Sequence, residues 1–377
     1  MLRVCIVGWY GTETLGDRSI LAGILTIYSK LSNNVDVKIA SLYPFYTKRT
    51  LYEDIQFYNE IAPNVNVSYF DFKNNNELRN TINNSNFIIM GGGPIMDLEQ
   101  LEYVYQSFKY SKKLNKKTVL FGCGIGPLKE EIYKKITIKL ISVSDLCIFR
   151  DYFAIDSLNQ IHNEFNKSYN TSKCHILFDP AILPPLFFRE HCKKESGEGI
   201  VMNLRKFDEF LSNDFYNSVE EKLKKLIVYL SNNNTIKMLP NHTFFVGGDD
   251  RLYFSELYLE LPKRTIELTE KPLSLKETFE VISQSKYGIA MRYHAVLFQT
   301  ILCGNNYILD YTEPGCGKMS GFINMIDGEE FYKSRYLNIQ SFDSMLNLDD
   351  NIFDSSNINF NAVVEKYVEL LKFYFYD

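Results

Sequence analysis

Short apolar runs alternate with amphipathic segments along almost the whole chain, and this alternation constrains the fold more than any other feature. Residues 2–7 form the first run, and residues 20–31 after it show the apolar periodicity of a helix. Further runs in the first half of the chain lie at residues 35–40, 86–90, 118–121 and 146–149. Strands that alternate with helices are typical of βαβ units, so the pattern predicts parallel sheets.

A second series of strands begins after a polar segment near the middle of the chain. Residues 159–196 contain Asp179-Pro180-Ala181 and Pro184-Pro185 and have the composition of a connection between domains. The strands predicted after it lie at residues 199–204, 235–239, 264–268, 287–291 and 306–309. A chain of 377 residues is long enough for two domains with separate cores. We predict Rossmann-like, doubly wound domains at 1–185 and 196–345 that face a cleft, with a C-terminal helix at 359–377 that packs back on the first.

Charge and cysteine content argue against several classes of protein. The net charge is −5, and no basic stripe is present that would neutralise nucleic-acid phosphates. The first apolar run is too short for a signal sequence, and no run approaches the roughly 20 apolar residues that span a bilayer. The 7 cysteines are scattered without a CxxC pair, which argues against a disulfide framework or a zinc site. We therefore predict a reduced, soluble, cytoplasmic protein that binds no metal.

The segment Met291-Arg292-Tyr293-His294 carries the strongest chemical signal in the chain. It lies where the apolar run 287–291 passes into the predicted helix 295–303. Arg292 offers a permanent planar cation for a carboxylate or phosphate, and His294 exchanges protons near neutral pH. The structural alternative is a histidine that only begins a helix beside a surface arginine, because short motifs are weak evidence alone.

A glycine-rich turn, residues 8–17, joins the first strand to the first helix. Its glycines let the backbone approach a ligand, and Asp17 is a candidate proton acceptor. Alternatively, Asp17 only caps the following helix. The turn is no P-loop, because Gly-Lys-Ser/Thr does not follow. The candidate ligand contacts in this turn are Tyr10, Gly11 and Glu13.

Two further glycine-rich turns follow later strands. Gly91-Gly92-Gly93 precedes Asp97, a second candidate base, and Gly92 and Gly93 are candidate contacts of a ligand. The segment 122–127 lacks the GxGxxG spacing, and no acidic residue ends the second strand, which argues against dinucleotide binding. Alternatively, 122–127 is a turn that only lets a helix pack on the sheet.

Cations follow the strands of the second domain as well. Asn203 and Arg205 end its first strand, and Arg205 would form a paired anion clamp with Arg292 if the strands were neighbours. A surface ion pair is the alternative for Arg205. His242 follows a later strand and is either a ligand contact or a loop residue. Lys318 follows the last strand and could add a positive charge at the start of a helix.

Taken in order, these segments resemble those of the polysaccharide pyruvyl transferase family, over residues 4–322. Each block is short, and the ordered set is specific. Thr14 and Arg18 depart from the residues common in the family, and 313–318 is looser than its usual pattern, which bears on the acceptor more than the donor. The matching blocks are Gly16-Asp17, Gly91-Gly92-Gly93 with Asp97, residues 122–127, Arg150-Asp151, Asp179-Pro180-Ala181, and Arg292 with His294.

The resemblance implies a fold like that of GT-B glycosyltransferases and phosphoenolpyruvate as donor, without another cofactor. The pyruvyl group would pass to two hydroxyls of a sugar as a cyclic ketal during synthesis of a cell-surface polysaccharide. The acceptor would be a polyprenyl-diphosphate-linked saccharide, met at the inner face of the membrane by a cytoplasmic or peripheral enzyme.

This chemistry suggests a role for each candidate residue. His294 would protonate the vinyl CH2 of the donor, and Asp17 or Asp97 would deprotonate the acceptor hydroxyls. The residues that would bind the donor are Asn203, Arg205, His242, Arg292 and Lys318. Those that would contact the acceptor are Tyr10, Gly11, Glu13, Gly92 and Gly93. Two alternatives remain open: a nucleotide-sugar glycosyltransferase on the same architecture, and a non-catalytic subunit of glycan assembly.

Overall fold

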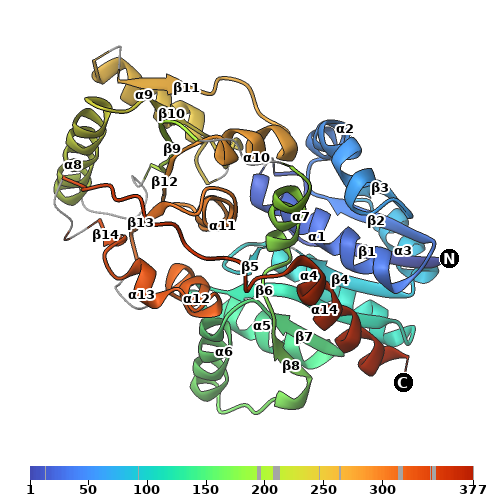
Figure 1. Ribbon diagram of the computed structural model, residues 1–377. Helices are drawn as coiled ribbons and strands as arrows, with labels where there is room; N and C mark the ends of the chain where they lie inside the picture. Colours follow the sequence, from blue (N-terminus) through green and yellow to red (C-terminus); the bar gives the residue numbers. More distant parts are fainter. Residues whose placement is uncertain are drawn as a thin grey trace. The chain divides into compact units, whose positions relative to one another are not determined.

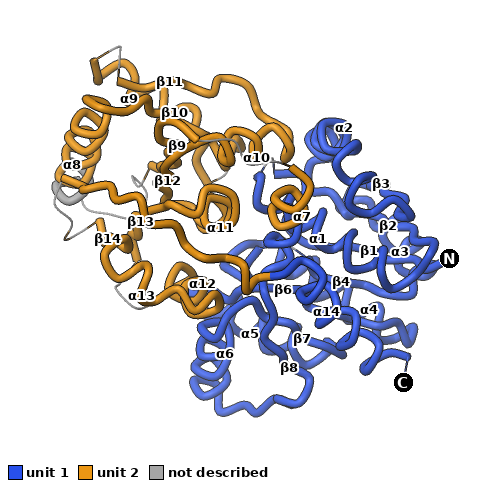
Figure 2. Tube along the Cα trace, viewed as in Figure 1, with its two compact units in different colours: residues 1–184, 359–377 blue, residues 185–358 orange. Residues whose placement is uncertain are grey.

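The computed structural model divides the chain into two compact units, each built on a parallel sheet (Figure 1). Unit 1 comprises residues 1–184 and 359–377, and unit 2 comprises residues 185–358 (Figure 2). The structure describes residues 1–377 except 13, 92, 193–196, 207–212, 246, 263–264, 313–316, 340, 342–344 and 377, and leaves the side chains of 213–217 undescribed. The calls on Glu13 and Gly92 therefore lie outside the described residues.

Unit 1 has the strand order β3-β2-β1-β4-β6-β7-β8, and the short β5 pairs with β6. All of these pairings are parallel, as the alternation of strands and helices predicts. The chain moves outward from β1 in one direction and then returns to β4 on its other side, which makes the β1/β4 boundary a topological switch point. The strands are β1 (Leu2–Val7), β2 (Val35–Ser41), β3 (Val65–Asp71), β4 (Phe87–Gly91), β5 (Pro94–Ile95), β6 (Lys117–Ile125), β7 (Leu146–Phe149) and β8 (Cys174–Ile176).

Helices bury both faces of this sheet. Along β4, Ile88 and Met90 belong to a core with Phe108 of α4, whereas Phe87 packs against Tyr28 of α1 at a ring distance of 5.8 Å. This arrangement explains the continuous apolar runs of the strands, since both faces of a parallel sheet are covered. The helices of unit 1 are α1 (Leu15–Leu31), α2 (Pro44–Ile61), α3 (Asn75–Asn84), α4 (Gln100–Lys113), α5 (Glu131–Val143), α6 (Tyr152–Glu164), the 3-10 turns η1 (Thr171–Lys173) and η2 (Pro180–Ile182), and α14 (Phe360–Phe375).

The C-terminal helix α14 packs on unit 1, although the whole of unit 2 precedes it in the sequence (Figure 2). Its buried face carries Val363, Tyr367 and Leu371, at the spacing of an amphipathic helix. The Tyr367 ring stacks on Phe121 of β6 at 5.0 Å, and its hydroxyl donates to the carbonyl of Phe178 at 2.6 Å. These contacts hold the end of the chain against the first sheet.

Unit 2 has the strand order β11-β10-β9-β12-β13-β14, again entirely parallel. This is the order of the Rossmann fold, with its switch point between β9 and β12. The strands are β9 (Ile200–Asn203), β10 (Ile236–Met238), β11 (Ile266–Leu268), β12 (Tyr287–Ala290), β13 (Asn306–Asp310) and β14 (Tyr336–Asn338). The other elements are α7 (Leu183–His191), which begins at the end of unit 1, α8 (Asn213–Ser231), α9 (Asp250–Glu260), α10 (Leu275–Ser283), α11 (Tyr293–Leu302), α12 (Lys318–Met325) and α13 (Glu329–Tyr332).

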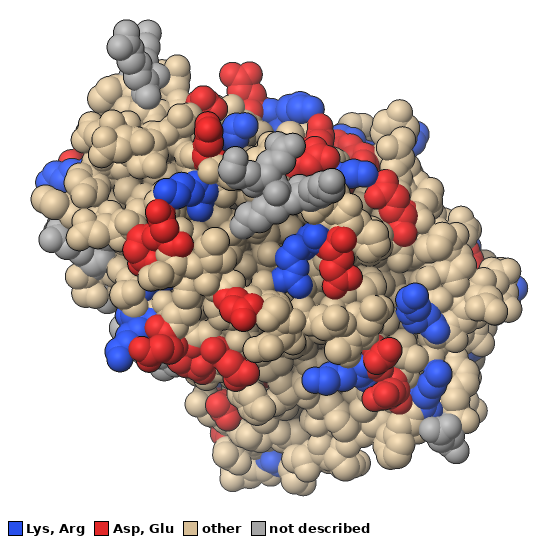
Figure 3. All heavy atoms as spheres, in the orientation of Figure 1, with Lys and Arg blue, Asp and Glu red and all other residues tan. Residues whose placement is uncertain are grey.

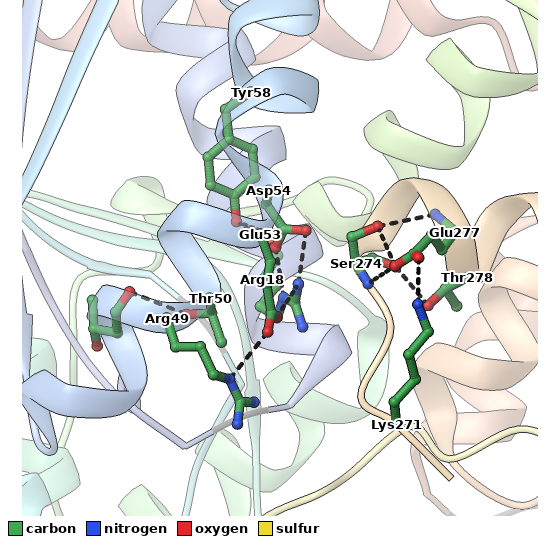
Figure 4. Close-up of polar contacts among 11 residues, drawn as sticks. Arg18, Arg49, Thr50, Glu53, Asp54, Tyr58, Lys271, Ser274, Glu277 and Thr278 are labelled. Carbon is green, nitrogen blue, oxygen red and sulfur yellow. Dashed lines mark hydrogen bonds and ion pairs between the residues drawn. The ribbon is translucent and has the colours of Figure 1, made fainter. Parts of the chain in front are cut away.

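Helix α10 begins with the capping box that the spacing of Ser274 and Glu277 predicts. The Ser274 hydroxyl accepts from the Glu277 N–H at 3.2 Å, and the Glu277 carboxylate accepts from the Ser274 N–H at 2.8 Å. Lys271 adds an ion pair to Glu277 at 3.0 Å (Figure 4). The Ser274 and Glu277 side chains therefore accept hydrogen bonds from N–H groups that have no partner within the helix.

The predicted fold class, two Rossmann-like domains of parallel α/β structure, is confirmed. Residues 159–196 are not only the connection between domains that the sequence predicts. In the structure they contain the end of α6, the edge strand β8, η2 and α7. Its polar composition is typical of an edge strand with partly exposed residues, which a short window does not distinguish from a loop. Strands β3, β5 and β14 were also absent from the prediction.

Candidate functional site

The strands β9 and β12 are neighbours, and their carboxyl ends bring Asn203, Arg205 and Arg292 to one edge of the second sheet. The backbone N–H of Met291 donates to the Asn203 carbonyl at 3.0 Å. The Asn203 side-chain oxygen accepts from the N–H of Arg292 at 3.3 Å. Ligands of doubly wound sheets bind at this switch point, so the fold brings these predicted donor residues to the edge where a ligand is expected.

Arg292 is held by a carboxylate that sequence reasoning did not assign. Its Nε donates to Asp250 at 2.9 Å and its Nη2 donates to the same carboxylate at 2.6 Å. Asp250 is buried and also accepts from the Asn203 amide at 3.2 Å. These bonds fix the plane of the guanidinium group. The one sequence signal for Asp250 is its place after Gly247-Gly248 at the start of a helix.

His242 contributes to the same turn through its backbone. Its N–H donates to Asp250 at 3.1 Å, and its carbonyl accepts from the Asp250 N–H at 2.9 Å. The imidazole is buried, with the Phe244 ring 6.5 Å away. Through its backbone His242 is therefore a support of Asp250, and contact of its ring with a donor stays a prediction.

Three cations converge on the phenol of Tyr311, the residue that follows β13. Arg205 Nη1 donates to the Tyr311 hydroxyl at 3.0 Å, and its guanidinium lies 5.0 Å from the ring centre. The Lys318 ammonium, at the start of α12, lies 5.9 Å from the same centre. Burial alone would raise the pKa of Tyr311, but Lys318, Arg205 and then Arg292 lower it to about 8. Arg205 thus contacts an aromatic hydroxyl at the carboxyl edge of the second sheet.

His294 lies at the second position of α11, two residues after Arg292. Its half-buried ring lies 5.0 Å from Tyr293 in an edge-on arrangement and 6.3 Å from Phe298 in a stacked one. The remainder of α11 is buried, so the histidine is carried on a rigid element at the same sheet edge as the cations. Its part in proton transfer stays a prediction.

In unit 1, Asp17 lies in the first turn of α1 and does not cap that helix. The N-cap is Thr14, and the Asp17 carboxylate accepts from the Thr12 hydroxyl at 3.2 Å. Burial raises the pKa of Asp17 to about 7, Asp179 adds to the rise, and the Thr12 bond and Arg150 oppose it. The capping alternative is therefore wrong, and the carboxyl group exchanges its proton near neutral pH.

Asp151 and Asp179, which belong to two of the short motifs, form a buried cluster with Arg150 at the carboxyl ends of β7 and β8. Arg150 Nη1 donates to Asp179 at 3.1 Å, and its Nε lies 3.5 Å from Asp151. Asp151 caps α6 through the N–H of Ala154 at 2.8 Å. A Cβ at Gly124 would lie 2.8 Å from the Arg150 guanidinium, so close packing against Arg150 requires a glycine at this position of the 122–127 turn.

The glycines predicted to contact an acceptor also have reasons within the fold. A Cβ at Gly11 would lie 2.7 Å from the backbone nitrogen of Tyr43, and the residue has a φ of 97°. A Cβ at Gly93 would lie 2.7 Å from the Trp9 ring and 3.8 Å from Asp17 Oδ1. Close packing therefore requires both glycines, whether or not a ligand approaches them.

Tyr10 is buried, and burial followed by the charge of Asp17 raises its pKa well above the ordinary value. Its hydroxyl has no hydrogen-bond partner among the described residues. It lines a cavity of about 20 Å³ together with Asp17 and residues of α1 and α2, a space that holds about one water molecule. Tyr10, Gly93 and Asp17 thus lie close together within unit 1.

Asp97 is held by a different part of the chain. Its Oδ2 accepts from the N–H groups of Lys129 at 2.7 Å and Glu130 at 3.3 Å, just before α5 begins. These bonds tie the turn after β5 to the start of α5. A structural role is therefore evident for Asp97, and its assignment as a base stays a prediction.

Arg18, the residue that departs from the family pattern, forms a buried ion pair in unit 1 (Figure 4). Its Nη2 donates to Asp54 of α2 at 2.7 Å and lies 3.2 Å from Glu53. The Tyr58 hydroxyl donates to the same Asp54 at 3.3 Å. This network joins α1 to α2 beside the small cavity, and a buried charge of this kind requires such partners.

A profile of the polysaccharide pyruvyl transferase family matches residues 15–302. The chain belongs to this family. The match covers the first helix of unit 1 and continues through α11, so it contains Asp17, Arg150, Asp250, Arg292 and His294. No curated protein sequence matches the chain.

Solved structures share the fold at low sequence identity. UDP-GlcNAc 2-epimerase from Methanocaldococcus jannaschii aligns at a TM-score of 0.57 and 10% identity, over 99% of this chain and 100% of the epimerase. MnaA of S. aureus, solved with UDP, gives 0.56 and 10% identity over 99% and 97%. HepE of Anabaena, solved with UDP-glucose, gives 0.54 and 10% identity over 99% and 100%. These likenesses establish a common two-domain architecture and not a common substrate.

Other classes of site are not evident in the described part of the chain. Within it, no group of three or more His, Cys, Asp or Glu residues is arranged to hold a metal ion. None of the described helices combines the length and apolar character that crossing a membrane requires. On the face drawn in Figure 3, the described acidic and basic side chains are interspersed. Nothing on this face resembles the basic track of a nucleic-acid-binding protein.

Proposed function

We propose that this pyruvyl transferase moves the pyruvyl group of phosphoenolpyruvate onto two hydroxyls of a sugar, forming a cyclic ketal and releasing phosphate. The observation that carries the proposal is the convergence of Arg205, Lys318 and Arg292 at the β9/β12 edge of unit 2. Phosphoenolpyruvate has both a carboxylate and a phosphate, so it requires several fixed cations. Arg292, fixed by Asp250, and Arg205 supply planar guanidinium groups suited to such anions.

The reaction begins with proton delivery to the vinyl CH2 of the donor, and His294 is the proposed acid. The new methyl group leaves an oxocarbenium-like centre at C2, which the first sugar hydroxyl attacks as it loses its proton. The C2–O bond to phosphate then breaks, and the second hydroxyl closes the ring. Of the two hydroxyl protons, one balances the proton delivered to carbon and the other leaves with phosphate.

Asp17 is the proposed base for the acceptor hydroxyls. Its carboxylate has a pKa of about 7 because it is buried near Asp179, so it accepts a proton more readily than an ordinary exposed aspartate. Asp97 is the weaker candidate, because backbone N–H groups already bind its Oδ2. Tyr10, Gly11 and Gly93, around Asp17, remain the proposed acceptor contacts, and Asn203 and His242 the proposed minor donor contacts.

The proposed acceptor is a saccharide linked to polyprenyl diphosphate, which the enzyme meets at the inner face of the membrane. No organic cofactor takes part in the proposed steps, since they consist of proton transfer and displacement at C2. The fold is equally compatible with a nucleotide-sugar glycosyltransferase, and a binding experiment separates the two.

Thermal stability with phosphoenolpyruvate, and separately with UDP-, GDP- and CMP-sugars, tests the donor without knowledge of the acceptor. A ligand at about 100 times its dissociation constant stabilises the fold by roughly 2.7 kcal/mol, which is a measurable shift. We expect phosphoenolpyruvate alone to stabilise the protein, and Arg205→Ala to abolish that shift.

Lys206→Ala provides the matched control, because Lys206 is the next residue and forms an ion pair with Glu256 at 2.7 Å. It should retain the shift. Stabilisation by a nucleotide sugar and not by phosphoenolpyruvate would replace this proposal with glycosyl transfer. No stabilisation by any donor would favour a non-catalytic subunit.

A further inference from the structure

Tyr311 is a residue of the donor site that sequence reasoning did not single out. It follows β13, the strand next to β12, so its phenol lies at the same carboxyl edge as Arg292. The Tyr311 hydroxyl accepts a hydrogen bond from Arg205 at 3.0 Å, and the Arg205 and Lys318 cations lie 5.0 and 5.9 Å from the ring centre. The Tyr311 phenol therefore lies where the Arg205 and Lys318 cations come together.

We infer that the Tyr311 hydroxyl binds the anionic group of the donor directly, as a hydrogen-bond donor that shares Arg205 and Lys318 with that anion. This inference rests on the proposed function, because it assigns a further residue to the same donor site. A guanidinium has five N–H groups in a planar fork, so Arg205 can hold both the phenol oxygen and a ligand oxygen. The phenol that accepts from Arg205 also carries a proton to donate, and an anion held by the same two cations lies within its reach.

The geometry makes the protonation state of Tyr311 decisive for binding. A neutral phenol donates to an anion, whereas a phenolate repels it. The charged groups that face Tyr311 come from three elements: Arg205 after β9, Arg292 before α11 and Lys318 on α12. Asp310, the last residue of β13, accepts hydrogen bonds from the hydroxyls of Thr312, at 2.8 Å, and Tyr336. Asp250 binds Arg292. In this surrounding the pKa of Tyr311 is about 8.

The sign of the pH dependence follows from linkage. A bound anion raises the pKa of Tyr311 above 8, so the complex holds more protons than the ligand-free protein. Donor affinity is therefore greatest below pH 8 and decreases as the pH rises through it. A donor phosphate is already fully ionised in this range, because its second pKa is about 6, so it does not produce the same dependence.

Calorimetric titration of phosphoenolpyruvate between pH 7 and 9.5 tests the inference. For the unchanged protein, the dissociation constant should rise by up to about tenfold per pH unit above 8, with proton uptake seen in buffers of different ionisation enthalpy. Tyr311→Phe keeps the ring beneath Arg205 and should bind about tenfold more weakly at pH 7.5, without the pH dependence. Tyr287→Phe, a matched loss of a phenol at the opposite end of β12, should change neither quantity.

Equal affinity and an equal pH dependence in Tyr311→Phe would overturn the inference and leave the proposed function intact. Absence of proton uptake by the unchanged protein would overturn it as well, independently of how the variant folds. If phosphoenolpyruvate does not bind and a UDP-sugar does, the proposed function fails. The same titration with the UDP-sugar then decides Tyr311, which is supported if the pH dependence disappears in the phenylalanine variant.

Discussion

The two units have the same strand order around their switch points, and the chemistry at those points differs. At the β9/β12 edge of unit 2, three cations surround a phenol and lower its pKa. In unit 1, the half-buried Asp17 lies close enough to the buried Asp179 and Arg150 for their charges to act on it, and the pKa of Asp17 is raised. A parallel sheet determines where a ligand site forms, whereas the residues after each strand decide whether the site attracts anions or exchanges protons. We interpret unit 2 as the donor site and unit 1 as the source of the base.

The largest expected effect belongs to His294, which tests whether unit 2 supplies chemistry in addition to binding. His294→Ala should lower turnover by about 10² to 10⁴-fold, the usual contribution of a positioned acid, while phosphoenolpyruvate still binds. Pyruvyl transfer to the acceptor and donor titration are the two measurements. His175→Ala is the control, since His175 forms a hydrogen bond with Tyr374 at 2.8 Å within unit 1. Full activity of His294→Ala would show that His294 is not the acid.

A comparison of the two arginine–aspartate pairs separates structural from binding roles. Arg18→Ala leaves Asp54 buried without its cation, and Arg292→Ala does the same to Asp250. Loss of one partner of a buried pair costs about 3–5 kcal/mol, so both variants should unfold at lower denaturant concentration. Arg292 is 16% exposed and should show the smaller loss.

Donor titration distinguishes these two variants at a temperature where both remain folded. Only Arg292→Ala should lose affinity for phosphoenolpyruvate, because Arg292 lies at the proposed donor edge of unit 2, whereas Arg18 forms its ion pair with α2 within unit 1. Equal donor affinity in both variants would show that Arg292 has a structural role only and would contradict the assignment of donor binding to it.

Asp17→Asn should lower turnover and raise the free energy of unfolding at alkaline pH. If Asp17 is the base, turnover of the unchanged enzyme decreases as the pH falls through about 7, and the variant loses about 10² to 10⁴-fold with no such limb. The folded pKa lies above the ordinary value, so the folded state binds the proton more tightly and loses stability as the pH rises from 4 to 7. The variant escapes this loss and should be more stable at pH 8 by about 1–2 kcal/mol, allowing for partial exposure of the carboxylate.

Denaturant unfolding at pH 5 and pH 8 measures this stability difference. It should be larger at pH 8, and a variant that is less stable than the unchanged protein at both pH values would contradict the burial argument for Asp17.

The smallest expected effect is that of a chelator. The proposed steps use His294, Asp17 and the three cations of unit 2, so excess EDTA should leave turnover unchanged. Strict dependence of turnover on an added divalent ion, tested after dialysis, would show that charge stabilisation in unit 2 is incomplete without a metal.

The fold class follows from the local sequence pattern, because apolar runs that alternate with helical segments are typical of parallel βαβ units. It also indicated the positions of the main site residues, since strand ends are visible as the end of an apolar run. Arg292 was recognised in this way, and so were Asp17 and Arg205. Local order along the chain carries this information.

Which residues act on one another depends on the three-dimensional arrangement of the chain. Asp250 lies 42 positions from Arg292, and Tyr311 lies 106 from Arg205, so neither pairing has a local signal. The raised pKa of Asp17 depends on burial, and the anchoring of Asp97 depends on backbone groups 32 and 33 residues away. Strand order brings such positions together, and hydrogen-bond geometry and desolvation are properties of that arrangement rather than of any segment.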